Sequence, residues 1–311
     1  MKQKETLVSV VMPVYNAGRF LDLAILSIMN QTYQNLELII VNDASSDNSA
    51  KIIAKYKKLY SRKIKVVTLT QNVNRGGDAA GNIGYSLAKG KYIARMDSDD
   101  IALPTRLAKQ VEYMEANKDV SVLGTQAEVI DINGVVVGVK KMPTSHELIE
   151  REFFTFHPLI HPTVMVRKSA IKRKKLYLTD YHANNDYLTF FTLLMQGKKM
   201  ANLSESLLQY RVHGDNDSLA HVKHNFINSL KIRSRAVFVM GYRPSLLSVM
   251  KLLAQSVLVF VLPEKVTVEL YYLVRGIKKW SNLWEYPNLG SVAKMKAYVQ
   301  AMVAGIFTTL R

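Results

Sequence analysis

Short apolar runs alternate with helix-forming segments along the N-terminal third of the chain, and this alternation constrains the fold more than any other feature. The first run, Leu7–Val14, is rich in β-branched residues, which is typical of a parallel strand buried on both faces. Three more strands are predicted at Leu36–Val41, Ile64–Leu69 and Tyr92–Met96. Helices are predicted at Arg19–Asn30, from the capping residues 45–48 to Tyr60, at Asp78–Ala88 and at Pro104–Asn117. This order implies βαβ units, and therefore an α/β fold with a doubly wound, mostly parallel, Rossmann-like sheet.

The chain continues with a predicted strand at Val120–Asp131 and a hairpin turn at Asn133-Gly134. It has 311 residues, of which 48% are apolar and 22% charged, which is the balance of a folded protein. This length allows a main domain with an appendage. Met1–Glu5 leads directly into an apolar run that is too short for a signal peptide, so we expect an intracellular protein.

Composition excludes several kinds of site. The chain has no cysteine, which excludes a disulfide framework, a thiolate zinc site, an iron–sulfur cluster and a cysteine nucleophile. A metal ion would therefore be held by Asp, Glu, His or water. The formal net charge of +17 predicts an anionic partner, which could be nucleic acid, an acidic membrane surface or a phosphorylated substrate.

Polar clusters follow three of the predicted strands at the point where each strand ends. They are Pro13-Val14-Tyr15-Asn16, Asn42-Asp43 and Asp97-Ser98-Asp99-Asp100. In open α/β sheets, ligands bind at the carboxyl ends of the strands. We therefore expect the three clusters to form one site.

The acidic cluster after the fourth strand points to a divalent cation, because crowded carboxylates repel one another unless a cation lies between them. Oxygen ligands favour Mg²⁺ or Mn²⁺. The alternative is a solvated turn that caps the next helix with negative charge. For Asp43, the alternative is an Asx-turn or an N-cap.

The segment Asn72–Gly84 is rich in glycine, so its backbone can approach a ligand closely, and Arg75 could pair with a phosphate. It is neither a Walker loop nor a GxGxxG fingerprint.

The segments that contain the polar clusters and the glycine-rich stretch, in this order and at this spacing, resemble glycosyltransferase family 2, of the bacterial surface-polysaccharide type with the GT-A fold. The resemblance runs through VSVVMPVYNAGRFL, LELIIVNDASSDNS and GNIGYSLAKGKYIARMDSDD. It implies an enzyme that transfers one sugar from a nucleotide diphosphate donor to an acceptor hydroxyl, with inversion at the anomeric carbon.

The resemblance also implies roles for individual residues. Pro13, Tyr15 and Asp43 would hold the nucleobase, Asp97 would contact the ribose or the metal, and Asp99 would be the principal metal ligand. The other nucleotide-sugar-binding candidates lie in the same motifs and are Asn16, Asn72, Arg75, Gly76, Asn82 and Ser98. The family often has Ala-Arg-Asn where this chain has Ala80-Gly81-Asn82, and Arg75 and Arg95 are the alternatives that could supply the missing charge.

Asp186 is the candidate catalytic base, because Asn185-Asp186 aligns with a Glu-Asp pair of the family upstream of Gly197-Lys198. The alternative is a helix N-cap, since the apolar run YLTFFTLLM follows it. Tyr210-Arg211-Val212-His213 resembles a family segment that closes over the donor diphosphate. Arg211 would contact the nucleotide sugar, and His213 would be a further metal ligand or a phosphate contact.

Two His-Pro pairs, His157-Pro158 and His161-Pro162, precede an apolar run that begins at Thr163. They could line the acceptor pocket, and a turn before a strand is the alternative.

Basic charge is concentrated in residues 225–311, which carry 12 Lys and Arg against 3 Asp and Glu. The apolar stretch between Pro244 and Pro263 has one polar stripe at helical spacing, and Val266–Trp280 repeats this pattern. Both fit helices that lie in the interface of an anionic membrane. The alternative is a helical appendage packed on the main domain with solvated basic faces.

The sequence thus predicts a GT-A domain at 1–224, with a nucleotide-binding half at 1–124 and an acceptor-side half at 125–224, followed by a basic, amphipathic helical region at 225–311. The expected enzyme is a metal-dependent hexosyl- or N-acetylhexosaminyltransferase that uses a UDP-sugar and a glycan or lipid-linked glycan acceptor in capsule, lipopolysaccharide or exopolysaccharide synthesis. We expect it in the cytoplasm, peripheral at the inner face of the cell membrane. The alternatives are a non-catalytic nucleotide-binding scaffold and a nucleotidyltransferase. Nucleic acid is not an expected partner, because the tail has no recognition motif.

Overall fold

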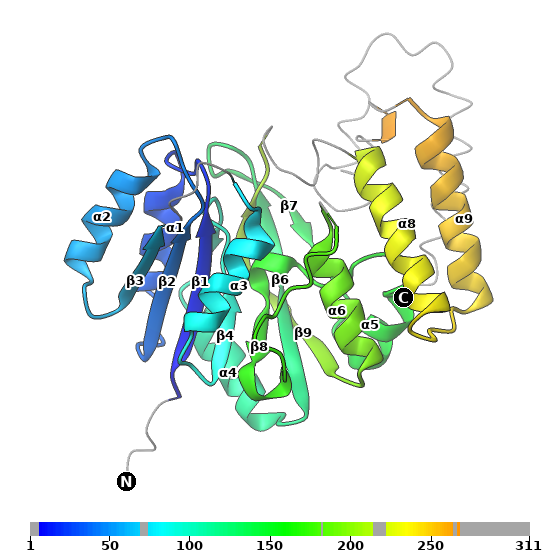
Figure 1. Ribbon diagram of the computed structural model, residues 1–311, viewed down its shortest axis with the longest axis horizontal. Coiled ribbons are helices and arrows are strands. Elements are labelled where there is room, and N and C mark those ends of the chain that lie inside the picture. The colour runs from blue at the N-terminus through cyan, green and yellow to red at the C-terminus, as the bar shows by residue number, and fades with distance from the viewer. Residues whose placement is uncertain (1–5, 69–73, 182, 214–221, 264–265, 268–311) are drawn as a thin grey trace.

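The computed structural model describes residues 6–68, 74–181, 183–213, 222–263 and 266–267 (Figure 1). The predicted alternation is confirmed in its order. The N-terminal elements are β1 (Val8–Val14), α1 (Leu21–Met29), β2 (Leu36–Asn42), α2 (Ser49–Leu59), β3 (Ile64–Thr68), α3 (Gly77–Leu87) and β4 (Tyr92–Arg95). Leu69, the last residue of one predicted strand, lies outside the described residues.

The second half of the chain contributes shorter strands and the remaining helices. In chain order they are β5 (Ile101–Ala102), α4 (Arg106–Ala116), β6 (Val120–Ile130), β7 (Val136–Lys140), α5 (His146–Glu152), η1 (His161–Thr163), β8 (Met165–Arg167), η2 (Lys168–Ala170), α6 (Asn185–Met195), β9 (Lys199–Arg211), α8 (Val222–Phe238) and α9 (Leu246–Val261). Pro104 lies in the turn before α4, because that helix begins two residues later than expected.

The strands form one mixed sheet in the order β3-β2-β1-β4-β8-β6-β9-β5, with β7 paired to β6. β1 pairs in parallel with both β2 and β4, and β2 pairs in parallel with β3. Beyond β4 the pairing changes, since β8 runs antiparallel between β4 and β6. The Rossmann-like half is therefore the N-terminal one. The second half is mixed, since β6 and β9 pair in parallel whereas β5 and β7 add antiparallel.

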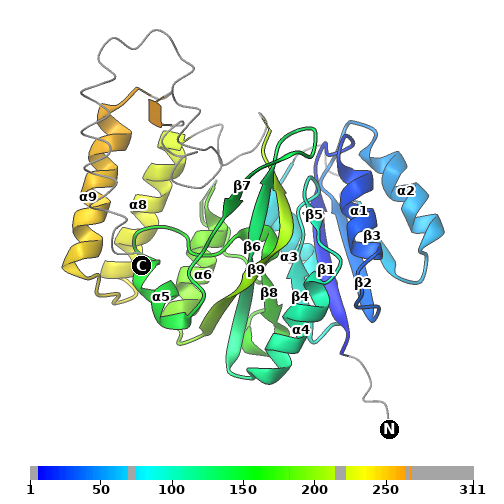
Figure 2. The same cartoon turned by 180° about the vertical axis from the view of Figure 1, so that it is seen from behind.

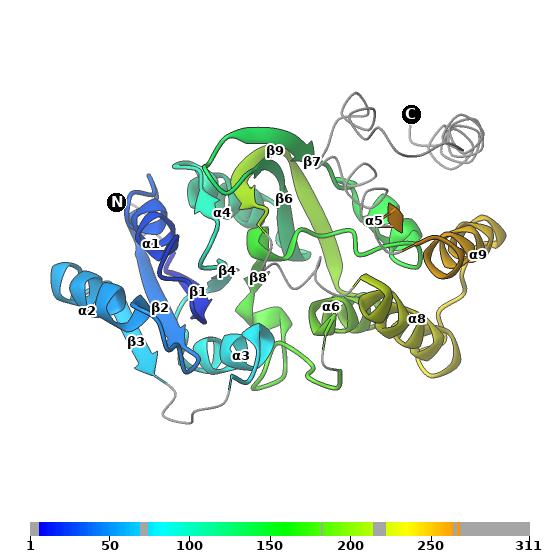
Figure 3. The same cartoon turned by 90° about the horizontal axis from the view of Figure 1, so that it is seen from above.

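Two apolar cores lie on opposite faces of this sheet, which explains the continuous apolar runs of β1 and β2. Val10 and Met12 of β1 face the core formed with α1, α2 and α4, whereas Val11 faces the core formed with α3, α6 and α8. Viewed from above, α1 and α4 lie on one side of the sheet and α3 and α6 on the other (Figure 3).

A short strand that the sequence did not predict fixes the acidic loop. Ile101 and Ala102 of β5 pair antiparallel with Gln209 and Leu208 of β9. The loop at residues 96–100 is thereby fixed at both ends, by β4 before it and by β5 after it. The predicted hairpin is confirmed, because β6 and β7 pair antiparallel and Gly134 has φ of 87° in the turn between them.

The C-terminal helices pack against the far end of the fold, away from β3 (Figures 1 and 2). Ile232 and Ala236 of α8 are buried in the same core as Phe190 and Phe191 of α6. The expected boundary between residues 224 and 225 falls within α8, and the division into domains stays a prediction. Most of the predicted helix at Val266–Trp280 lies outside the described residues.

Candidate active site at the carboxyl edge of the sheet

The loops that follow β1 and β2 are held together by short polar side chains. Asn16 and Ala44 have positive φ of 48° and 61°, which is uncommon for residues other than glycine. The Asn16 side-chain oxygen accepts a hydrogen bond from Ser46 N at 2.8 Å, and Asn16 N donates to Ser45 Oγ at 3.1 Å. Asn16 therefore shapes the loop after β2.

Asp43 lies at the end of β2 with 2% of its surface exposed. Its Oδ2 accepts hydrogen bonds from the backbone N–H groups of Arg75 and Gly76 at 2.9 and 3.0 Å. The N-cap alternative is wrong, since Asn48 is the N-cap of α2. The Asx-turn alternative is also wrong, because Oδ2 bonds to the distant amides of Arg75 and Gly76 and Oδ1 bonds to no described residue. Its Oδ1 is buried and has no hydrogen-bond partner among the described residues. Such an oxygen is costly to bury unless a ligand donor satisfies it.

Four other residues expected to contact the nucleotide sugar, of which Tyr15 and Pro13 were expected at the nucleobase, are arranged differently. Tyr15 is 48% exposed beside the Asp43 loop and presents an aromatic face to solvent. Pro13 is buried within β1. Gly76 precedes α3 with φ of 87°, a conformation that favours glycine. Asn72 lies outside the described residues.

Asn82 supports the site from within the core. Its side-chain amide donates to Tyr177 O at 2.9 Å, and its oxygen accepts from Tyr177 N at 2.8 Å. Both ends of the amide are thus bonded to one backbone segment, so Asn82 ties α3 to the chain before α6.

Each of three carboxylates in the acidic loop has a different partner. Asp97 Oδ1 accepts from Arg95 Nε at 2.8 Å, and Asp99 Oδ2 lies 3.1 Å from His213 Nε2. Asp100 Oδ1 accepts from Arg211 N at 2.8 Å. The crowding that the sequence suggested is thus relieved largely by the protein itself, and Ser98 lies half-buried among these carboxylates.

The pKa values of two of these carboxyls move in opposite directions. Burial and the charges of Asp99 and Asp97 raise the pKa of Asp100 well above its ordinary value. Burial alone would also raise the pKa of Asp97, but the charges of Arg95 and His161 lower it on balance. Asp97 is therefore the ionised member of this pair.

The Asp99–His213 pair supplies one oxygen and one nitrogen donor, and Asp97 is the nearby second carboxylate. This donor set suits Mn²⁺, which accepts both carboxylate and imidazole. Within the described residues no cluster of three such side chains is already arranged around one metal position. Arg211 is buried, and its guanidinium donates to the backbone oxygens of Asp99 and Asp131 at 2.8 and 3.0 Å. It thereby fixes the backbone that carries the proposed metal ligand.

A second cluster lies on the acceptor side, around Asp186 in the first turn of α6. Asn184, with φ of 63°, is the N-cap of this helix, so the N-cap alternative for Asp186 is wrong. Asp186 Oδ2 lies 3.6 Å from His157 Nδ1 and 3.8 Å from His161 Nδ1. The two His-Pro segments thus bring both imidazoles to the candidate base.

The charged groups of this cluster shift one another's pKa values. Burial alone would raise the pKa of Asp186, but the charges of His157 and His161 lower it. Burial raises the pKa of Asp78, and the charge of Asp186 contributes to that rise. Asp186 is therefore a carboxylate at neutral pH.

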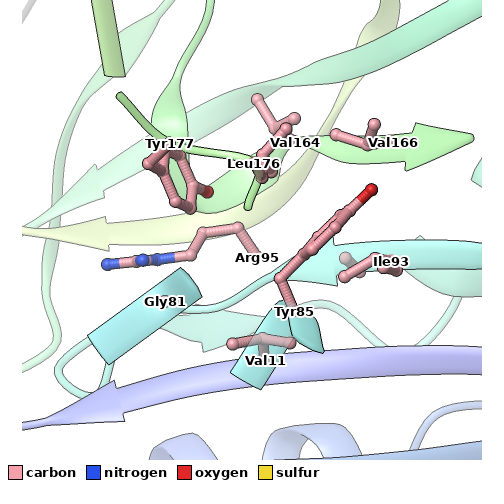
Figure 4. A pocket seen from close by; sticks show the side chains of 10 residues that line it. Val11, Gly81, Tyr85, Ile93, Arg95, Val164, Val166, Leu176 and Tyr177 are labelled. Carbon is pink, nitrogen blue, oxygen red and sulfur yellow. The ribbon is translucent and has the colours of Figure 1, made fainter. Parts of the chain in front are cut away.

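Two residues that sequence reasoning did not assign, Asp78 and Tyr177, lie between the two clusters beside His161 and Arg95. His161 Nε2 lies 2.9 Å from the Tyr177 hydroxyl and 3.9 Å from Asp78 Oδ1. The Arg95 guanidinium carbon lies 5.8 Å from the centre of the Tyr177 ring. Figure 4 shows Arg95 between Tyr177 and Gly81. The sequence signal for Arg95 was the glycine at position 81, where the family often has arginine, and no local signal indicated Asp78 or Tyr177.

Comparison with known proteins identifies the family of this chain. Residues 9–174 match the sequence profile described as glycosyl transferase family 2. The chain is 36% identical over 212 residues to the O-antigen biosynthesis glycosyltransferase WbnJ of Escherichia coli, which covers 67% of this chain and 80% of WbnJ.

Two solved structures share the fold. TarS of S. aureus, in complex with UDP-GlcNAc, superposes with a TM-score of 0.63 at 19% identity, over 81% of this chain and 73% of that protein. The mannosyltransferase PcManGT of Pyrobaculum calidifontis, in complex with GDP-Man and Mn²⁺, has a TM-score of 0.55 at 17% identity, over 89% and 87% of the two chains. Both are GT-A glycosyltransferases, and the expected GT-A fold is confirmed.

The family match covers more than half of the chain and includes β1, β2, β4 and the acidic loop. We conclude that this chain belongs to glycosyltransferase family 2 and has relatives in surface-polysaccharide synthesis.

Proposed function

We propose that the protein is an inverting, metal-dependent glycosyltransferase that moves one hexose or N-acetylhexosamine from a UDP-sugar to an acceptor hydroxyl of a surface glycan. The single observation that carries this proposal is the placement of Asp186. Its carboxylate lies between two imidazoles on the acceptor side, and its charge also acts on Asp97 of the acidic loop. The closeness of Asp186 to the proposed donor-binding carboxylates supports this proposal.

Asp186 would act as the general base. A carboxylate within hydrogen-bond reach of the acceptor hydroxyl takes its proton while that oxygen attacks the anomeric carbon. Because the attack occurs opposite the departing diphosphate, one step inverts the centre. The lowered pKa of Asp186 keeps it ionised, and therefore able to accept a proton, at neutral pH.

On the donor side, Asp43 would accept a hydrogen bond from a nucleobase N–H through its unsatisfied Oδ1. Tyr15 would offer its exposed ring to the base. Asp99 and His213, with Asp97, would hold Mn²⁺ or Mg²⁺. The bound ion would neutralise charge on the diphosphate as it leaves.

The test is a panel of nucleotide sugars with Mn²⁺, Mg²⁺ or EDTA, in which release of nucleoside diphosphate is measured and the new glycosidic linkage is assigned by NMR. The proposal expects metal-dependent release from one UDP-sugar and a product of inverted anomeric configuration. Binding of nucleotide without turnover would establish a scaffold instead, and release of pyrophosphate would establish a nucleotidyltransferase.

A peripheral membrane location is part of the proposal. None of the described helices is long and apolar enough to cross a membrane. However, α9 exposes apolar side chains on a continuous face, which includes Leu246, Met250, Leu253, Val257 and Phe260, each more than half exposed. Residues 222–263 contain no acidic residue. This combination suits contact with anionic lipid at the inner face of the cell membrane, where a lipid-linked glycan acceptor would be presented.

A further inference from the structure

Two glycines of α3 leave space for the side chain of Arg95. Gly77 and Gly81 are one helical turn apart and therefore lie on the same face of α3. A Cβ atom at Gly81 would lie 2.8 Å from Arg95 Nη1, and one at Gly77 would lie 3.1 Å from Nη2. The guanidinium thus rests on bare backbone in the space where the side chain of residue 81 would otherwise begin (Figure 4).

The contacts of Arg95 leave part of its hydrogen-bonding capacity unused. Its Nε donates to Asp97 Oδ1 at 2.8 Å and its Nη1 donates to Gly77 O at 3.1 Å. Its Nη2 makes no hydrogen bond to any residue that the structure describes. A guanidinium carries N–H donors on all three nitrogens, so this one can still bind an anionic oxygen.

The position of Arg95 favours a phosphate group as that anion. Its Nε is hydrogen-bonded to Asp97, and its Nη1 contacts the backbone of Gly77 in the first turn of α3. The N-terminus of a helix of this length carries partial positive charge and favours anions. Its bond to Asp97 also places Arg95 beside the proposed donor diphosphate.

We propose that Arg95 binds the diphosphate of the nucleotide sugar and replaces a cation that Gly81 cannot provide. This inference rests on the proposed function. A guanidinium can hold two phosphate oxygens in a fixed geometry, which the ammonium of a lysine cannot reproduce. Arg95 would therefore bind the donor and stabilise the charge of the leaving nucleoside diphosphate.

The first test is Arg95→Gln, with calorimetric affinities for UDP and for UMP in the presence of Mn²⁺. We expect the variant to bind UDP about 10- to 100-fold more weakly, since charged hydrogen bonds are lost. Binding of UMP should change much less, because the second phosphate is missing. Arg62→Gln, at an exposed position between α2 and β3, is the matched control.

Two further variants keep the test decisive if Arg95→Gln folds poorly. Gly81→Ala keeps the arginine but pushes its guanidinium away, so it should weaken UDP binding and spare UMP binding. Gly81→Arg combined with Arg95→Ala moves the cation to the helix and should regain part of the UDP affinity that Arg95→Ala loses.

The outcomes separate this inference from the proposed function. If the wild-type protein binds no nucleoside diphosphate, the proposed function fails. If the wild-type protein binds UDP and both Arg95→Gln and Gly81→Ala bind it equally well, only the role of Arg95 is wrong. Equal losses for UDP and UMP would assign Arg95 a purely structural role and overturn the inference as well.

Discussion

The donor and acceptor sides of the site are built by different means. On the donor side, side chains at strand ends are held by backbone groups, as Asp43 is by the amides of Arg75 and Gly76. On the acceptor side, rings pack on rings. His157 and His161 lie 5.8 and 6.2 Å from the ring of Phe190, and they present imidazole nitrogens to Asp186.

This difference indicates which side of the site can change its side chains without a change in the sheet. A strand end and a helix start are fixed by main-chain pairing, so the donor side is tied to the sheet itself. The acceptor side depends on the packing of aromatic side chains from Phe153 after α5, from α6 and from the segment around Tyr177, which can vary without changing the sheet. We expect donor binding and turnover to respond to separate sets of substitutions.

The largest expected effect is on turnover. Asp186→Asn removes the proposed base and should lower kcat by about 10²- to 10⁴-fold. The affinity for UDP should stay within a few-fold of the wild-type value, as measured by calorimetry. Asp119→Asn, at a surface ion pair with Lys199, is the control. A near-normal rate in the Asp186 variant would exclude it as the base.

The second-largest expected effect is on nucleotide binding at the donor side. Asp43→Ala removes the acceptor of two backbone N–H groups and the oxygen proposed to meet the nucleobase. Nucleotide affinity should fall about 10- to 100-fold, because a buried hydrogen bond to a charged group is lost. Thermal unfolding measured alongside should show a lower Tm, since the two amides are left without their carboxylate. Unchanged affinity for UDP would place the nucleobase elsewhere.

The pH dependence of turnover tests the two histidines. Burial alone would raise the pKa of Asp186, and the charges of His157 and His161 lower it. Removal of both charges in His157→Asn/His161→Asn should therefore raise that pKa, and the acidic limb of the pH–rate profile should move to higher pH. An acidic limb at the wild-type position would show that the imidazoles do not set the ionisation of the base.

The free energy of unfolding of the wild-type protein should depend on the ionisation of Asp186. Because the folded pKa of Asp186 is lowered, its stabilising contribution is present above the unfolded value near 3.8 and is lost as the pH falls through the lower folded value. Denaturant unfolding of the wild-type protein and of Asp186→Asn between pH 7 and pH 3 should converge at the acidic end. Parallel curves would contradict this linkage.

The smallest expected effect on chemistry concerns α9, which joins the acceptor side through α8. Leu253→Asp and Val257→Asp place charges on the exposed apolar face and should reduce sedimentation with anionic vesicles. Turnover with a water-soluble acceptor should be unchanged. Binding to neutral and anionic vesicles that is equally weak in the wild-type protein would refute membrane contact.

Most of the donor side could be predicted from the sequence, because it follows from local patterns. Apolar runs locate the parallel strands, and the residues that come next must lie at the carboxyl edge. The positions of Asp43 and Asp99 after β2 and β4 were predicted in this way, and their roles stay predictions. The structure places His213 beside Asp99, and the role of each as a metal ligand stays a prediction.

The acceptor side was less predictable, since its members come from separate loops. Nothing in the local sequence around Tyr177 or Asp78 indicates that His161 joins them. The N-cap alternative for Asp186 was plausible from its neighbours, and only the conformation of Asn184 excludes it. Strand β5 is too short for any periodic signal.

The sequence alone determined the order of strands and helices in the N-terminal half and the family, because both depend on residues that are adjacent or regularly spaced. The tertiary structure decided which charges meet. Arg95 lies against α3 because the glycines at 77 and 81 leave space there. Asp186 lies between two histidines because α6 packs against both His-Pro segments. Such contacts depend on shape in three dimensions, which the spacing of residues along a chain does not specify.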